Sequence, residues 1–192
     1  MKDTVKAIVR LAIITIVAGL ALGLTNAITA EPIKEQERLA AESARRAVLV
    51  AEEYQEVDLN SLQSDPGWED SFTVIKSMYR GMNGAEYLGM VVEIGATGYG
   101  GEIRLTVGVG ADGKVSGIMV GSNSETAGLG AKAGNPDFMA QYKGLDATNT
   151  IQVGQGDGNS IEAIAGATVT SRGVTDGVNT ACKAALLFGE GE

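Results

Sequence analysis

The sequence predicts an α+β fold, in which a single N-terminal transmembrane helix precedes a domain with an antiparallel sheet and flanking helices. Three observations lead to this class. Residues 11–30 are uncharged, the middle of the chain alternates β-rich segments with turn residues, and residues 170–188 show helical spacing of apolar side chains. A chain of 192 residues has room for one ordinary domain and an appendage, but not for two full domains.

The first segment is predicted to cross a membrane. Residues 11–30 read LAIITIVAGLALGLTNAITA. At about 1.5 Å per residue, such a helix spans roughly 30 Å, the thickness of a bilayer core. Lys2, Lys6 and Arg10 precede it and acidic residues follow, so the positive-inside rule places residues 1–10 in the cytoplasm and the rest outside. A cleaved signal peptide and a buried helix of a soluble protein are the alternatives.

Residues 31–56 are predicted to form a stalk helix, because small and apolar side chains recur on one face and charges fill the other. Pro32 suits the first turn of such a helix. Residues 57–192 then form the extracytoplasmic domain. Its predicted elements are strands at residues 71–79, 86–94, 102–110 and 114–121, a short helix at 135–142, a short strand at 151–153 and a final helix at about 170–188.

The composition excludes several kinds of chemistry. The chain has no histidine and one cysteine, which rules out a Ser–His–Asp triad, a His-ligated zinc, a four-cysteine iron–sulfur cluster and an intrachain disulfide. The net charge of -9 argues against nucleic-acid binding, which requires a basic surface. If the protein transfers electrons, an organic cofactor must carry them.

Three segments combine glycine with polar side chains. They are GYGG at residues 98–101, SETAGLG at 124–130 and AGATVTS at 165–171. The glycines let backbone approach a flat ligand closely, and hydroxyls beside a helix N-terminus favour an anion. Each segment also has a simpler interpretation: a hairpin loop, a connecting loop, and helix capping by Thr170 or Ser171.

The order of these features resembles the covalent FMN-binding domain family, most closely the G subunits of Rnf ion-translocating electron transport complexes. The C subunits of sodium-pumping NADH:quinone reductases share this domain. The resemblance covers about residues 1–188, with the motifs dense from Gly98 onward. It is specific because three separate signatures occur in the family's order, whereas any one alone would be weak.

In that family, FMN is joined through its phosphate to a threonine in a sequence like Asp-x-x-Ser-Gly-Ala-Thr. The resemblance implies covalent attachment to Thr168, although Glu162 replaces the aspartate and Ala165 replaces the serine. The family's Glu-Thr-Pro-Gly-Leu-Gly is matched by residues 125–130, with Ala127 in place of proline. The histidine that often precedes this segment in the family is absent.

The resemblance also implies which residues surround the cofactor. No catalytic residue and no metal ligand is expected in this chain. The expected cofactor-binding residues are Gly98, Tyr99, Gly100, Glu125, Thr126, Gly128, Leu129, Gly130, Gly166, Ala167, Val169, Thr170 and Ser171.

The implied function is that of an electron-relay subunit in a membrane-bound, ion-translocating ferredoxin:NAD oxidoreductase. Its partners would be the other membrane subunits of the complex, and a separate FMN transferase would attach the flavin. Two alternatives remain: the C-type subunit of a sodium-pumping NADH:quinone reductase, and a membrane-anchored binding or scaffold domain without a redox cofactor.

Overall fold

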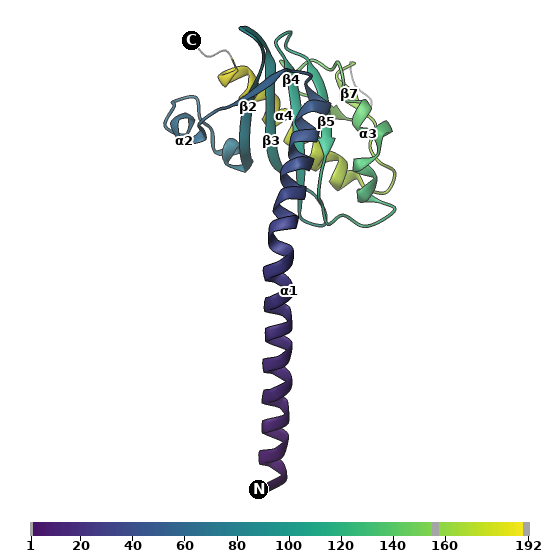
Figure 1. Ribbon diagram of the computed structural model, residues 1–192. Helices are drawn as coiled ribbons and strands as arrows, with labels where there is room; N and C mark the ends of the chain where they lie inside the picture. Colours follow the sequence, from purple (N-terminus) through teal and green to yellow (C-terminus); the bar gives the residue numbers. More distant parts are fainter. Residues whose placement is uncertain (1, 155–157, 190–192) are drawn as a thin grey trace. The chain divides into compact units, whose positions relative to one another are not determined.

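The computed structural model describes residues 2–154 and 158–189. The chain divides into two compact units, Met1–Glu42 and Ser43–Glu192. The first unit consists of helix, and the second contains the sheet and the remaining elements (Figure 1).

The predicted membrane helix and stalk form one continuous helix, α1, over Lys2–Val48. Pro32 lies inside this helix and not in a first turn. The part of α1 from Ile8 onward is long and apolar enough to cross a membrane, with a mean hydropathy of 2.2 in its most apolar window and no residue of that window buried. These properties favour a membrane helix over the alternative of a buried helix in a soluble protein.

The stalk helix ends at Val48 and not at residue 56. The chain leaves the helix there because Glu53–Glu56 forms strand β1, which pairs antiparallel with β2. Two hydrogen bonds hold this transition: Glu52 N–H donates to the Met82 carbonyl at 3.1 Å, and the Tyr54 hydroxyl donates to the Leu49 carbonyl at 2.5 Å. Pairing with a sheet edge outweighs the helical pattern of a short charged segment.

An antiparallel sheet of five strands, in the order β1-β2-β3-β4-β5, forms the centre of the second unit. This confirms the predicted α+β class. After β1, its strands are β2 (Ile75–Asn83), β3 (Glu86–Thr97), β4 (Glu102–Gly110) and β5 (Val115–Val120). In a small parallel pair, β6 (Gln152–Val153) lies within the strand predicted at residues 151–153, whereas its partner β7 (Ser160–Ile161) was not predicted. The other elements are α2 (Leu59–Leu62), η1 (Asp70–Val74), η2 (Gly130–Gly134), α3 (Pro136–Ala140) and α4 (Thr168–Phe188).

One predicted strand starts later than expected. Residues 71–74 belong to the 3-10 helix η1, and β2 begins only at Ile75. Phe72 is fully buried in η1, where its ring makes edge-to-face contacts with Trp68 and Phe188. This aromatic cluster, which joins distant parts of the chain, stabilises a helical turn where the local pattern predicted a strand.

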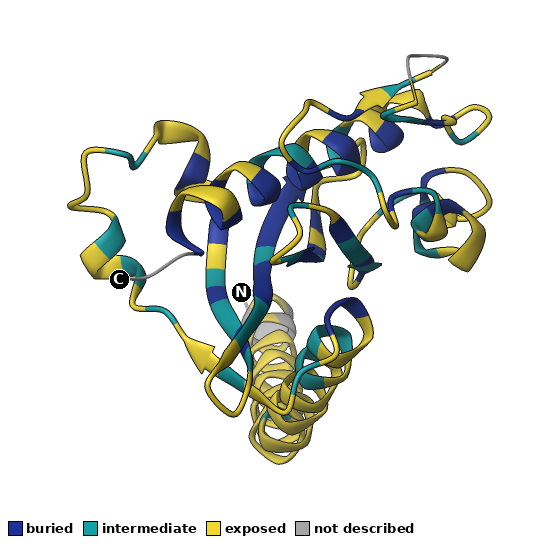
Figure 2. Ribbon diagram, turned by 90° about the horizontal axis from the view of Figure 1, so that it is seen from above, coloured by how far each residue is buried: buried dark blue, intermediate teal, exposed yellow. Residues whose placement is uncertain are grey.

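Both faces of the sheet are covered within this unit. Helix α4 packs across one face (Figure 1), and Figure 2 shows buried residues gathered between α4 and the strands. On the other face Val91 of β3 packs with Val48 and Leu49, at the end of α1. A strand buried on both sides needs apolar side chains in succession, which explains the run Met90-Val91-Val92 in β3.

Helix α4 lies close to β3 because glycines occupy the contact. A Cβ atom on Gly177 would lie 2.9 Å from the Cβ of Ala96, and a Cβ on Gly173 would collide with the carbonyl oxygen of Thr97. Two glycines in a helix lower its intrinsic stability, and here they permit a backbone approach that no other residue allows. The contact brings the first turns of α4 to the end of β3.

Gly173→Ala is expected to lower the free energy of unfolding by about 1–3 kcal/mol, because its methyl group must push α4 away from a backbone carbonyl. The matched control is Gly134→Ala, where a Cβ would meet nothing within 4 Å. Thermal unfolding of the full chain in detergent, followed by circular dichroism, measures both variants. Equal unfolding temperatures for the two would contradict the close contact.

Candidate functional site

The three glycine-containing segments meet at one end of the domain. Residues 98–101 connect β3 to β4, residues 124–130 follow β5, and residues 166–171 lead into and begin α4. The carboxylate of Glu125 joins them. Its Oε1 accepts a hydrogen bond from the Gly100 N–H at 2.7 Å, and its Oε2 accepts one from the Thr170 hydroxyl at 2.6 Å.

The glycines at this junction permit the segments to pack against one another. A Cβ on Gly98 or Gly130 would collide with the Glu125 carboxylate, and one on Gly100 would collide with the Ser124 carbonyl. The closest neighbours of these three glycines are therefore protein atoms. Gly128 and Gly166 have positive φ values of 80° and 76° and provide the turns on either side.

The first turn of α4 is not capped by a side chain. The helix begins at Thr168 after Ala167, and neither Thr170 nor Ser171 caps it. Thr170 bonds to Glu125, while the Ser171 hydroxyl donates to the Ala167 carbonyl at 3.0 Å and accepts from the Ile164 N–H at 2.9 Å. The first N–H groups of a helix have no partner within it, so they remain available to an anion.

Thr168 differs from the other two hydroxyl residues of this turn. Its side chain is exposed, and within residues 2–154 and 158–189 it has no hydrogen bond. Exposed apolar side chains accompany it, one from each segment: Tyr99, Leu129 and Val169. A free hydroxyl, unpaired N–H groups and exposed apolar surface therefore occur together.

The remaining predicted residues lie in the same segments. The Thr126 carbonyl accepts hydrogen bonds from the N–H groups of Leu129 and Ala131, which closes the loop before η2. The contact between Thr97 and Gly173 was not predicted to belong to the site. The one signal for it in the sequence was a glycine inside a helical pattern.

Residues 98–183 match the FMN-binding domain family. The G subunit of a Na⁺-translocating ferredoxin:NAD⁺ oxidoreductase complex from Acetobacterium woodii is 37% identical over 176 residues, which covers 87% of this chain and 84% of that protein. The G subunit of an ion-translocating oxidoreductase complex from Methanosarcina acetivorans is 30% identical over 182 residues, covering 94% and 93%. The chain belongs to this G-subunit family. It carries the family's FMN-binding domain.

A solved structure has a similar fold. The C subunit of the Na⁺-translocating NADH-quinone reductase from Parabacteroides distasonis superposes with a TM-score of 0.56 at 19% identity, covering 79% of this chain and 84% of that one. At this identity the likeness extends to the fold alone.

The residues present at the junction fit an FMN group. Its phosphate needs N–H donors and, for a covalent ester, a free hydroxyl, which the start of α4 and Thr168 supply. Its ring needs exposed apolar side chains, which Tyr99, Leu129 and Val169 supply. The small residues before the helix, Ala165 and Gly166, are exposed and leave the approach to Thr168 open.

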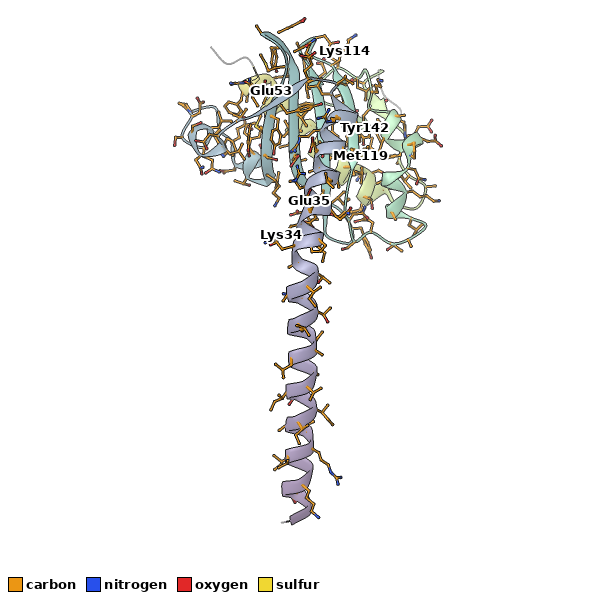
Figure 3. All side chains as sticks on the ribbon, viewed as in Figure 1. Lys34, Glu35, Glu53, Lys114, Met119 and Tyr142 are labelled. Carbon is orange, nitrogen blue, oxygen red and sulfur yellow. The ribbon has the colours of Figure 1, made fainter. Side chains whose placement is uncertain are left out.

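Two other polar groups of this G-subunit family member lie outside the three segments, although the Thr175 hydroxyl donates to the Ser171 carbonyl at 2.8 Å. The Tyr142 hydroxyl (labelled in Figure 3) lies 2.7 Å from Thr175 Oγ1, and burial raises the pKa of Tyr142 well above its usual range. Burial also raises the pKa of the Cys182 thiol to about 12, so the single cysteine is a protonated core residue at neutral pH.

A polar pocket of about 680 Å³ also lies outside the junction. Hydrogen bonds from Thr148 and Asn149 hold the pKa of the Asp146 carboxyl on its wall below the usual range. The pocket is lined by Gly144, Leu145, Asp146, Asn149, Thr150, Gln152, Gly158 and Asn159. None of them is a predicted cofactor-binding residue.

Proposed function

We propose that this chain is the electron-relay subunit of a membrane-bound, ion-translocating ferredoxin:NAD oxidoreductase, and that it holds FMN through a phosphodiester on Thr168. The family membership supports the complex. The observation that carries the attachment site is the exposed hydroxyl of Thr168, free of hydrogen bonds within the described residues, at a helix start that no side chain caps.

The residues of the junction have separate roles in this proposal. Thr168 Oγ1 forms the ester bond to phosphorus, losing its proton and displacing the leaving group of an activated flavin phosphate ester that an FMN transferase presents. The N–H groups at the start of α4 stabilise the one negative charge that the phosphodiester keeps. Tyr99, Leu129 and Val169 line the flavin ring, and Glu125 fixes the loop that carries Tyr99. The bound flavin supplies the electron-carrying chemistry.

We further propose the orientation in the membrane. Lys6 and Arg10 lie before the apolar part of α1, whereas Glu31, Glu35 and Glu37 follow it. The positive-inside rule then places the N-terminus in the cytoplasm and the FMN-binding domain outside, next to the other membrane subunits. A covalent link prevents the loss of the cofactor on that side.

The decisive experiment is the intact mass of the full chain after co-expression with an FMN transferase and denaturation. We expect a gain equal to FMN less one water, located on Thr168 by peptide fragmentation. An unmodified mass would support a scaffold domain without a redox cofactor, and a gain located on another residue would refute the attachment site.

A further inference from the structure

Helix α4 carries a basic side chain one turn after Thr168. Arg172 is exposed. In the part of the chain that the structure describes, its guanidinium forms neither a hydrogen bond nor an ion pair. Arg38 and Arg45 of α1 differ, since Arg38 pairs with Glu35 and Glu42, and Arg45 pairs with Glu93 at 2.9 Å. An arginine in this place is available to a ligand.

The helix brings Arg172 over Thr168. Residues four apart lie on the same face of an α-helix, with Cβ atoms about 5–6 Å apart. Helical side chains also lean toward the N-terminus, so a residue covers the turn before its own Cα. Both residues lie in the first turns of α4 and both are exposed, so this spacing lets the guanidinium reach across an open surface toward the Thr168 hydroxyl.

Asp176, four residues after Arg172, is a charged neighbour of it on the same helix. The described structure contains no ion pair between these two side chains. An acidic group on the N-terminal side of a basic one is the more favourable order on a helix, because it also suits the helix dipole. A phosphate on Thr168 would precede Arg172 and would therefore give the favourable order. Asp176 follows Arg172 and gives the less favourable one.

We propose that Arg172 is a positioning residue for the flavin phosphate. It binds the phosphate of the incoming flavin beside Thr168 and holds the phosphodiester after attachment. A guanidinium can donate two parallel N–H bonds to phosphate oxygens, while the N–H groups at the start of α4 approach the same phosphate along the helix axis. This inference rests on the proposed attachment of FMN to Thr168.

The test compares the rate of flavin attachment among variants of the full chain. Each is purified without flavin in detergent and incubated with the transferase and its flavin donor, and intact mass is followed over time. We expect Arg172→Gln to slow attachment about tenfold, because glutamine can still donate a neutral hydrogen bond but lacks the charge and the paired donors of the guanidinium. Arg172→Lys retains the charge without the paired donors, so its rate of attachment should lie between those of the wild type and Arg172→Gln. The control is Lys143→Gln, which removes an exposed lysine at the other end of β5.

A second measurement separates phosphate binding from recognition by the transferase. Attachment should raise the unfolding temperature of the wild type more than that of Arg172→Gln, because only the wild type pairs the phosphodiester with a guanidinium. Without flavin the two should unfold at the same temperature. Added salt should slow attachment in the wild type and have less effect in Arg172→Gln.

The outcomes distinguish this inference from the proposed function. Normal attachment to Thr168 in Arg172→Gln, with the same thermal shift, would overturn the role of Arg172 and leave the attachment site intact. Lys132, the basic residue of η2, is replaced by glutamine in the same assay. If attachment were slow in Lys132→Gln and normal in Arg172→Gln, the phosphate would bind at η2, which would also overturn the role of Arg172. No attachment in the wild type would refute the proposed function itself, and this inference with it.

Discussion

Replacing Thr168 with alanine is expected to remove all covalent flavin and leave the domain folded. The three hydroxyl residues at the start of α4 are not equivalent acceptors. Thr170 is 1% exposed and Ser171 0%, and both hydroxyls are already hydrogen-bonded. Only Thr168 is exposed. A transferase therefore cannot attach flavin to either neighbouring hydroxyl unless the first turn of the helix opens.

Because the Thr168 side chain is exposed, Thr168→Ala should hardly change the stability of the domain. The Thr168 side chain makes no hydrogen bond within the described residues and does not cap the helix. Its loss should therefore change the free energy of unfolding by no more than about 0.5 kcal/mol. In-gel flavin fluorescence and intact mass measure attachment, and thermal unfolding measures the fold. Thr168→Ser is the matched control, since it keeps the hydroxyl and should still be flavinylated. Covalent flavin on Thr168→Ala would disprove the attachment site.

The parts of the fold that depend on local pattern could be predicted. Strand β4 has the predicted bounds and β5 nearly so, because apolar alternation and the turn at Ala111-Asp112-Gly113 are local signals. Strand β1 could not be predicted, because Glu-Tyr-Gln-Glu continues a charged helical pattern and becomes a strand only by pairing with β2. The start of β2 depends on Phe72, which is buried by residues far along the chain.

The candidate site, too, could be predicted from the sequence only in part. Its three segments could be found from glycines and hydroxyls in sequence, and their convergence agrees with a single site. The bonds that hold them together could not be found, because Glu125 meets Gly100 and Thr170 across 25 and 45 residues of sequence. The spacing of Arg172 from Thr168 on one helix could not be found either, because the predicted helix began at about residue 170, whereas α4 begins at Thr168.

Glu125→Ala is expected to lower the free energy of unfolding by about 2–4 kcal/mol and to slow flavin attachment severalfold. Hydrogen bonds to a charged acceptor contribute about 1.5–3 kcal/mol each, and the half-buried position of this carboxylate reduces the sum of its two bonds. Without it the buried Thr170 hydroxyl loses its acceptor and the Gly100 N–H is released. The loop that carries Tyr99 is then no longer fixed to the first turn of α4.

Two further variants identify the cause. Glu125→Gln keeps an oxygen for the Gly100 N–H, and the Thr170 hydroxyl can turn to accept from the amide, so it should lose only about 1 kcal/mol. Glu56→Ala removes an exposed acid on β1 and should change little. Thermal unfolding and the attachment rate are measured for all three variants in the full chain. If Glu125→Ala matched Glu56→Ala in both, the carboxylate would not be what joins the three segments. If attachment slowed without loss of stability, Glu125 would act on the flavin directly and not through the loop.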